Sequence, residues 1–315
     1  MTFSRILMMF IAAGALLGGA DKILGNRFGL GQKFDDGFLL MGPMALSMTG
    51  IICIVPLLSA WLGGIIRPIL SAVGIDPAMF GCVLAIDMGG YQLAMDLAQD
   101  PEIGRFSGII ASSMFGCTLV FTLPVGMSVL QDEDRPFFLK GLLAGLISLP
   151  MGLFIGGLLQ GLSFGTILYQ CIPIFLLPGL ADLDEALKIV GSIAIVMLGS
   201  LPLAELLRRS LSRPFRWIGS KTGLNDTSTA GLIVGTLTVM PALVMVRNMD
   251  QRGKVLCGAF LVCGASAFAA HMGFAAGTQP DLILPLLGGK FAGALLSLAI
   301  ALRMTRTASI QPSKL

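Results

Sequence analysis

The chain has 315 residues, of which 55% are hydrophobic and 12% are charged, and its formal net charge is only +3. A soluble domain carries about 25% charged residues, so this composition excludes a water-soluble globular protein. The mean hydropathy of +0.87 and the apolar runs of about 20 residues that recur from end to end predict an all-α, polytopic transmembrane helical bundle. The 41 glycines suit such a bundle, because small residues let membrane helices approach closely.

Hydropathy predicts about seven full spans and two apolar segments that are interrupted near their middles. The spans cover residues 3–20, 38–60, 105–130, 138–160, 186–207, 254–277 and 281–303. The interrupted segments are 77–98, which contains Asp87–Gly90, and 227–248, which contains Thr238–Pro241. Residues 1–20 also resemble a signal peptide, but a retained first helix is preferred because the following chain is embedded in the membrane.

The placement of Lys and Arg predicts how these segments are oriented. The loops 208–221 and 247–254 are basic, which favours the cytoplasm for both. Both can be cytoplasmic only if segment 227–248 enters and leaves on one side, as a re-entrant hairpin or a pair of half-helices. Segment 77–98 has flanks poor in Lys and Arg and is predicted to enter and leave from outside. The alternative is that both segments cross fully.

A weak internal repeat supports this topology. Gly81 precedes Gly108 by the same interval as Gly231 precedes Gly258, and the interrupted segments lie inside the two matching blocks. We therefore predict one membrane domain, 1–315, with repeat-like halves at about 38–160 and 186–303 in opposite orientation. Inverted repeats with broken helices are typical of secondary transporters, which bind substrate near the midplane.

Asp87 is the most informative residue, because it lies deep in an apolar run. A charge in hydrocarbon costs several kcal/mol, so Asp87 is expected to face a cavity or a partner. Gly89 and Gly90 follow it and would let the chain unwind, bringing backbone carbonyls toward a ligand. An anionic side chain beside exposed carbonyls suits an ammonium ligand or a cation. The alternative is a structural Asp that caps a half-helix or pairs with a lysine.

Two further ionisable residues lie inside apolar spans. Lys290 follows Gly288 and Gly289 in the last span, where an ion pair with Asp87 and a substrate role are both open. His271 is the only histidine, and it could relay protons or pack as a neutral, hydrogen-bonded residue.

Polar residues near the two interruptions complete the predicted substrate site. Thr236 and Thr238 could offer hydroxyls to a ligand, although satisfying backbone groups freed by Pro241 is the preferred interpretation. Tyr91 and Gln92 could line the same cavity as Asp87. The acidic stretch Phe34–Phe38 is interpreted as an N-terminal cap of the second span.

Other functional classes lack support in the sequence. There is no phosphate-binding loop, HExxH or GxSxG motif, and the six cysteines lie in apolar stretches without a CxxC pair. Asp96, Asp100, Asp132 and Asp134 faintly resemble the metal-binding carboxylates of membrane transferases, but they lie in loops without supporting His or Asn residues. We expect no enzyme activity, no catalytic residue, no metal, no cofactor and no nucleic-acid partner.

Several motifs together resemble the ethanolamine-utilisation permease family, EutH, over nearly the whole chain. They are Asp21–Ile23, Lys33–Phe38, Met41-Gly42, Asp87–Gly90, Met249–Val255, His271–Ala276 and Gly289-Lys290. The resemblance implies a multi-pass protein of the bacterial inner membrane that admits ethanolamine. Its partners would be this small molecule and the lipid bilayer, and assembly into a homo-oligomer is left open.

Three features depart from the family pattern. The chain is shorter near residues 165–184, Thr238-Val239 replace paired Asn residues, and Ala270 replaces an acidic residue before His271. The last two changes remove polar groups from the expected site. They leave open a carrier for another small polar solute, and the shortening leaves open a non-transporting membrane partner. A membrane enzyme for lipid-linked substrates is the alternative from another class.

Overall fold

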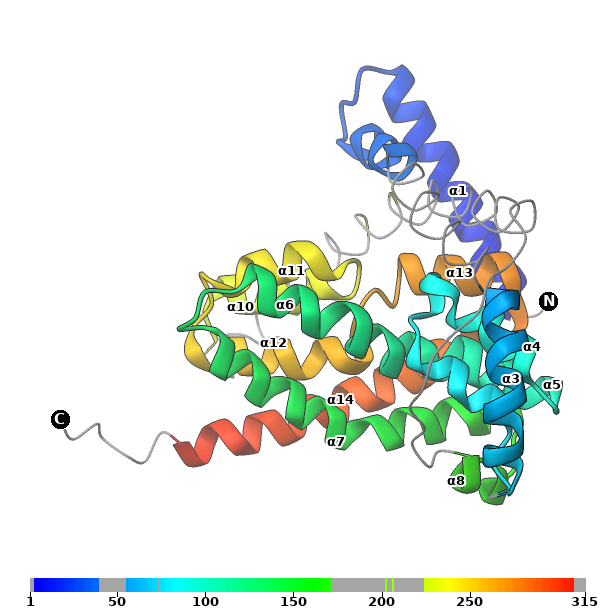
Figure 1. Ribbon diagram of the computed structural model, residues 1–315. Helices are drawn as coiled ribbons and strands as arrows, with labels where there is room; N and C mark the ends of the chain where they lie inside the picture. The colour runs from blue at the N-terminus through cyan, green and yellow to red at the C-terminus, as the bar shows by residue number, and fades with distance from the viewer. Residues whose placement is uncertain are drawn as a thin grey trace.

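A computed structural model of the chain describes residues 3–39, 55–72, 74–170 and 224–308, together with positions 202 and 206. Within these ranges the secondary structure is entirely helical. Figure 1 shows a bundle of long helices, α7 (Arg135–Gln160), α12 (Gln251–Gly264), α14 (Ile283–Ala308) and the helical segment that ends in α6 (Leu123–Val129). The shorter helices α10 (Asp226–Gly235), α11 (Val239–Val246) and α13 (Ala270–Thr278) lie beside it. The predicted all-α fold is therefore confirmed for the described part of the chain.

The first helix, α1 (Phe3–Ile23), forms a hairpin with a helix at 30–39. Asp21 caps the second helix, because its carboxylate accepts the backbone N–H groups of Leu30 and Gly31 at 2.8 and 2.9 Å. The predicted cap at Phe34–Phe38 is therefore wrong, since that stretch lies inside the helix. Its carboxylates form ion pairs instead, Asp35 with Lys22 and Asp36 with Lys33.

Acid is expected to open this hairpin turn. Burial by itself would raise the pKa of the Asp21 carboxyl, but the N–H groups of Gly31, Phe28 and Leu30 outweigh it and hold the pKa below its ordinary value of 3.8. A lowered folded-state pKa stabilises the turn above the unfolded pKa, and the contribution disappears as pH falls through the folded value. Hydrogen-exchange protection factors of residues 24–31 should therefore drop below about pH 4, whereas Asp21→Asn should show low protection at every pH. Equal protection in both proteins would contradict this role.

Three helices in the described part are long and apolar enough to cross a membrane. They are Pro101–Val129, built from α5 (Pro101–Arg105), η3 (Phe106–Gly116), η4 (Thr118–Thr122) and α6 (Leu123–Val129); α7 (Arg135–Gln160); and Pro280–Thr305, built from η5 (Pro280–Leu282) and most of α14 (Ile283–Ala308). Their outer faces carry exposed apolar side chains such as Leu143, Ile147 and Leu295, which suits contact with lipid. The predicted spans 38–60 and 186–207 lie largely outside the described residues, so seven spans remain a prediction.

The predicted span 38–60 ends too early, because α3 (Val55–Ala72) continues to residue 72. Its end meets the next helix, η1 (Pro77–Val83), at a bend of 114°. A short helix, α8 (Phe164–Gln170), follows α7. Its Gln170 side chain accepts the backbone N–H of Asp76 at 2.8 Å, so α8 packs against the turn between α3 and η1.

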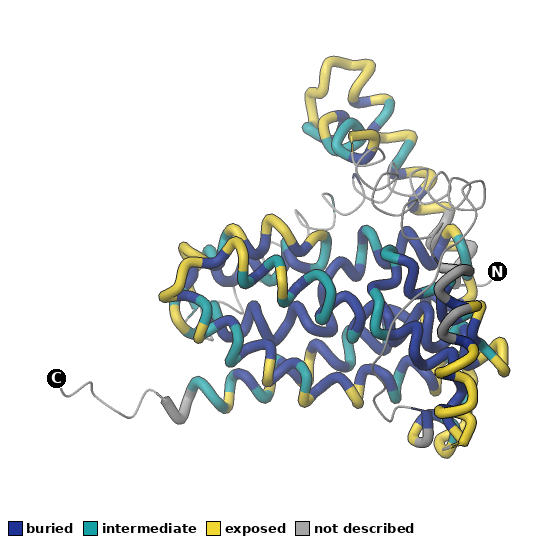
Figure 2. The backbone as a smooth tube through the Cα atoms, viewed as in Figure 1, coloured by how far each residue is buried: buried dark blue, intermediate teal, exposed yellow. Residues whose placement is uncertain are grey.

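The helices α7 and α14 cross closely and run in opposite directions (Figure 1). A Cβ on Gly289 would lie 2.6 Å from the Gly152 carbonyl oxygen and 3.0 Å from the Gly156 Cα. A Cβ on Gly293, one turn later in α14, would lie 3.2 Å from Gly152 Cα. Glycine at these positions therefore allows direct backbone contact between the two helices. Figure 2 shows that buried residues concentrate where α7, α12 (Gln251–Gly264) and α14 pack.

The antiparallel packing gives the bundle two chemically different ends. We call one the acidic end; it contains Asp76, Asp96, Asp100, Glu102 and Asp281, with Arg67 and Arg105 among them. The other end has more Lys and Arg, and we call it the basic end. There α7 and α12 begin and α14 finishes, and it contains Arg135, Arg247, Arg252, Lys254 and Arg303 together with the carboxylates Asp132, Glu133, Asp134, Asp226 and Asp250. This asymmetry agrees with the predicted cytoplasmic side of loop 247–254.

The first interrupted segment folds back on itself. It comprises η1, η2 (Ile86–Gly90) and α4 (Tyr91–Leu97). Asp76, at its start, caps η1 through the N–H of Ala78 and also accepts the N–H of Asp100 at 2.7 Å. Both ends of this first hairpin therefore meet at the acidic end of the bundle.

The second interrupted segment has the same design at the basic end. It comprises α10 (Asp226–Gly235) and α11 (Val239–Val246). Asn225 caps α10 and donates its side-chain amide to the Asn248 carbonyl at 3.1 Å, while its backbone N–H donates to Asp250. The interruption falls at 236–238, which overlaps the predicted break at Thr238–Pro241 and includes Thr236. Pro241 lies in the first turn of α11, where proline is tolerated.

The predicted span 254–277 is broken, which corrects the sequence interpretation. It divides into α12 and α13 (Ala270–Thr278) around an extended Ala265 and a left-handed Ser266 with φ of 51°. The backbone N–H groups freed by the break donate to the second hairpin turn, Ser266 to the Gly235 carbonyl and Phe268 to the Thr236 carbonyl, both at 2.9 Å. Because these partners come from another segment, the break leaves few unpaired backbone groups.

Candidate functional site

The turn of the first hairpin carries Asp87. Ala85 is extended with ψ of 148°, and the helical geometry fails again at Met88 and Gly89. Gly89 has φ of 85°, a left-handed conformation that favours glycine. A Cβ on Gly90 would lie 2.5 Å from the Leu84 carbonyl oxygen and 2.7 Å from the Ser112 hydroxyl. The two predicted glycines thus shape the turn that holds the half-buried Asp87 inside the bundle.

Lys290 is fully buried on α14, and its ammonium donates to the Ser113 carbonyl at 2.8 Å. Ser113 lies in the π-helical stretch η3. The N–H of Cys117, which an α-helix would direct to Ser113, donates to Ser112 and Met114 instead. The Ser113 carbonyl thus accepts the Lys290 ammonium and lacks the α-helical bond from Cys117. The sequence analysis missed this acceptor, because a backbone carbonyl leaves no signal in residue type.

Asp87 and Lys290 lie close without touching. Lys290 interacts electrostatically with Asp87, Cys117 and Cys263. In the part of the chain that the structure describes, however, no ion pair within 4.0 Å joins the carboxylate to the ammonium. The direct pair considered from the sequence is therefore absent. The Ser113 carbonyl holds the ammonium aside, and Asp87 keeps oxygens available for another cation.

His271 lies in the first turn of α13 and is 1% exposed. It interacts electrostatically with Lys290, so it belongs to the same polar group. Its Nδ1 is buried without a hydrogen-bond partner among the described residues. A buried polar atom without a partner costs roughly 1–3 kcal/mol, so such an atom commonly marks a place where a ligand or water binds.

The second hairpin turn contributes backbone rather than side chains. The Thr236 hydroxyl donates to the Ile233 carbonyl at 2.6 Å, as expected of a residue that satisfies freed backbone groups. The Thr236 carbonyl accepts a hydrogen bond from the Phe268 N–H, which connects the second hairpin to the break between α12 and α13. Thr238 is exposed and caps α11 without a side-chain hydrogen bond, so its hydroxyl does not join the Asp87 group.

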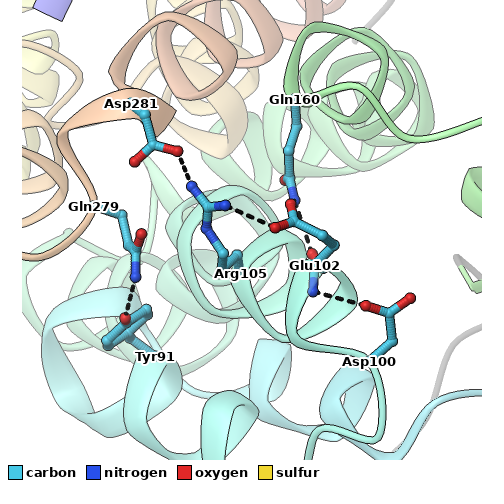
Figure 3. A network of polar contacts seen from close by, with 7 residues as sticks. All are labelled: Tyr91, Asp100, Glu102, Arg105, Gln160, Gln279 and Asp281. Carbon is cyan, nitrogen blue, oxygen red and sulfur yellow. Dashed lines mark hydrogen bonds and ion pairs between the residues drawn. The ribbon is translucent and has the colours of Figure 1, made fainter.

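Tyr91 and Gln92 lie toward the walls of the site. The Tyr91 hydroxyl accepts the Gln279 amide at 2.8 Å, and its ring packs edge-on against Phe274 with centroids 5.7 Å apart. These contacts close α4 against α13 near the acidic end, as Figure 3 shows for Tyr91 and Gln279. Gln92 lies in the first turn of α4, and both polar atoms of its side-chain amide are buried without a hydrogen-bond partner among the described residues. The structure thus groups Asp87, Lys290 and His271, with Gly89 and Gly90 shaping the turn.

The site offers no metal-binding group. Within the described ranges, no cluster of three or more His, Cys, Asp or Glu side chains could hold a metal ion. Asp100 and Asp134 instead lie at helix N-termini at opposite ends of the bundle. They therefore do not form the carboxylate cluster at one face that a metal-dependent membrane enzyme would need.

Comparison with known proteins identifies the family. The sequence profile described as "Ethanolamine utilisation protein, EutH" matches residues 3–178 and 174–304. The chain belongs to the EutH family. It is 35% identical to protein YxeR of Bacillus subtilis, with 100% of this chain and 98% of the relative aligned. It is 34% identical to the probable ethanolamine permease EutH of Listeria monocytogenes, over 96% of this chain and 95% of the relative. The Escherichia coli protein of the same name is 30% identical, over 95% and 91%.

Membership in the EutH family makes the chain a membrane transport protein rather than an enzyme. The alignment with YxeR runs over 363 residues, more than the 315 of this chain, so this EutH member lacks residues that its relative has. The two profile matches meet at residues 174–178, within the region predicted to be shortened. No solved structure matches the chain.

Proposed function

We propose that this EutH protein carries ethanolamine across the bacterial plasma membrane and binds it near the midplane, between the turns of the two hairpins. Three curated relatives that align over nearly the whole chain are named as probable ethanolamine permeases. Thr238 is exposed, so the departure there falls outside the Asp87 group, whereas Ala270 lies beside His271. Asp87 itself is unaffected by either departure, so an ammonium ligand remains compatible with both.

The transmembrane arrangement that we propose is a pair of inverted repeats with about seven spans. Each half contains a hairpin whose ends meet at one end of the bundle, followed by two long segments. The final helices, α7 and α14, have 26 residues each and run antiparallel. The basic end would face the cytoplasm and the acidic end the outside. The first hairpin would then enter from outside and the second from the cytoplasm, as in many secondary transporters.

One observation carries the substrate assignment, namely the half-buried Asp87, which interacts with Lys290 but forms no ion pair with it. The remaining described carboxylates lie in turns, at helix ends or in the α1 hairpin. Ethanolamine is mostly a cation at neutral pH, so Asp87 would bind its ammonium. Lys290 would lower the cost of keeping Asp87 charged in a low-dielectric interior, while the Ser113 carbonyl prevents it from occupying Asp87.

The substrate hydroxyl requires a second polar partner. We propose His271 Nδ1, which lacks a partner among the described residues and can accept or donate a hydrogen bond. Gly89 and Gly90 would bring backbone groups close to the ligand, and Tyr91 and Thr236 would support the walls of the site. A ligand with both an ammonium and a hydroxyl would satisfy both buried groups, whereas a simple amine would satisfy only Asp87.

Uptake into proteoliposomes tests this function. Labelled ethanolamine should enter saturably at about pH 6, where an amine is almost wholly protonated and leaks little through lipid. Unlabelled ethanolamine should compete best, ethylamine about tenfold less well because it leaves His271 unpaired, and ethylene glycol hardly at all. Competition by ethylene glycol as strong as by ethanolamine would overturn the role of Asp87. Uptake no faster than in empty vesicles would overturn the substrate.

A further inference from the structure

Two ion pairs connect the halves of the molecule, one at each end of the bundle. At the acidic end, Arg105 of α5 pairs with Asp281 of η5 (Figure 3). At the basic end, Lys254 of α12 pairs with Asp134, the residue before α7. The ion pairs of Asp35, Asp36, Glu102 and Asp132 are local, within one helix or its first turn or within the α1 hairpin. Arg105–Asp281 and Lys254–Asp134 differ from these because each joins one half to the other.

The two ion pairs occupy equivalent positions in the repeat. Arg105 and Lys254 each lie near the start of the long segment that follows a hairpin. Asp281 and Asp134 each lie at the start of a half's final segment. The spacing between equivalent members closely matches the spacing of Gly81 from Gly231. Each cation thus reaches across to the acidic residue of the opposite half.

A second contact between the two halves lies near the ion pair at the acidic end. Tyr91 of α4 accepts a hydrogen bond from Gln279, two residues before Asp281. Arg105 also pairs with Glu102 on its own helix, and Gln160 of α7 donates to the Glu102 carbonyl at 2.7 Å. Figure 3 shows these residues as one network. If Asp281 moved away, Arg105 would keep Glu102 as a partner, so opening would not leave an unpaired charge.

From this arrangement we propose that Arg105–Asp281 is the outer gate and Lys254–Asp134 the inner gate of the transport pathway. This inference rests on the proposed transport function. Both pairs are formed in the structure, which therefore corresponds to an occluded state. Transport requires one pair to break while the other holds, so that the Asp87 site opens to one side at a time.

Burial predicts that the two gates differ in strength. The Lys254 and Asp134 side chains are 13% and 7% exposed, whereas Asp281 at the acidic end is 62% exposed. Exposed ion pairs are weak, and breaking a buried pair is costly. The outer gate therefore opens more readily than the inner one.

The chain's own thiol at Cys117 can test the gates without any substrate. Cys117 is a free, buried cysteine one helical turn after Ser113, whose carbonyl binds Lys290, so its reactivity reports access to the site. In a full-length protein that keeps Cys117 alone of its cysteines, a membrane-impermeant methanethiosulfonate is added from outside or from inside. Arg105→Ala should raise outside labelling about fivefold, and Lys254→Ala should raise inside labelling about tenfold or more.

Arg135→Ala is the matched control, because it removes a first-turn ion pair, with Asp132, that stays within one half. It should change labelling from neither side. The charge swap Arg105→Asp with Asp281→Arg should return outside labelling to the starting level, which separates gating from misfolding. Unchanged labelling in both single variants, or an equal rise from both sides, would overturn the gates. Since no ethanolamine is present, these outcomes are independent of whether ethanolamine is the substrate.

Discussion

Replacing Asp87 with asparagine is expected to lower saturable ethanolamine uptake at least about 100-fold. Asparagine keeps the size of the side chain and removes its charge, so the substrate ammonium would lose a charge-assisted bond worth roughly 3 kcal/mol in a buried site. Lys290 would also lose its compensating anion, which leaves two cations in one polar group. The measurement is the initial rate of uptake into proteoliposomes over a range of ethanolamine concentrations.

Asp96→Asn is the control for this prediction. Asp96 lies on α4 in the same hairpin, but it is exposed near the acidic end, and uptake should change less than about twofold. Both variants must insert and show thermal unfolding midpoints close to the unmodified protein. Saturable uptake that survives Asp87→Asn would assign Asp87 a structural role in the hairpin turn and leave the transport function standing.

Replacing Gly289 with valine is expected to destabilise the bundle by about 2–3 kcal/mol, the range for overpacking in a tight core. The new Cβ would lie 2.6 Å from the Gly152 carbonyl oxygen and 3.0 Å from the Gly156 Cα. Both neighbours are backbone atoms of α7, so no side chain can rotate away, and the two helices must separate. The midpoint of thermal unfolding in detergent should fall by several degrees.

Gly64→Val provides the comparison, since a Cβ at Gly64 meets no atom within 4 Å and the residue is exposed on α3. This variant should change the free energy of unfolding by less than about 0.5 kcal/mol, because valine is no poorer a helix former than glycine at an exposed position. Equal losses in both variants would show that valine is unfavourable in these helices generally. The α7–α14 crossing would then not be the reason for glycine at position 289.

Several properties of this protein follow from its sequence alone. The scarcity of charge and the recurring apolar runs predicted a helical membrane protein, because a helix of about 20 apolar residues pairs its own backbone groups across the bilayer. Asp87, Gly89 and Gly90 predicted the first hairpin turn, since a charge and two glycines inside an apolar run disrupt a continuous helix. The basic loop after residue 246 predicted that segment 227–248 returns to the side from which it starts. Each inference depends on local composition, which the sequence displays directly.

The tertiary structure decided how these parts meet. The span 254–277 is broken because the N–H groups of Ser266 and Phe268 find acceptors in the second hairpin, more than 25 residues away. Lys290 donates to a backbone carbonyl of η3 and forms no ion pair with Asp87, because packing places its ammonium beside Ser113. The helix at 30–39 begins where Asp21, in the preceding helix, caps it.

The pairing of Arg105 with Asp281 and of Lys254 with Asp134 likewise has no signal in the local sequence. Both pairs form because α7 and α14 pack antiparallel through glycine, which brings the start of each half's final segment beside a helix of the other half. Partners distant in the chain, and backbone groups whose availability depends on helix geometry, are fixed only when the helices pack. The sequence therefore determined the membrane fold and the location of the buried carboxylate, and packing determined which groups surround it.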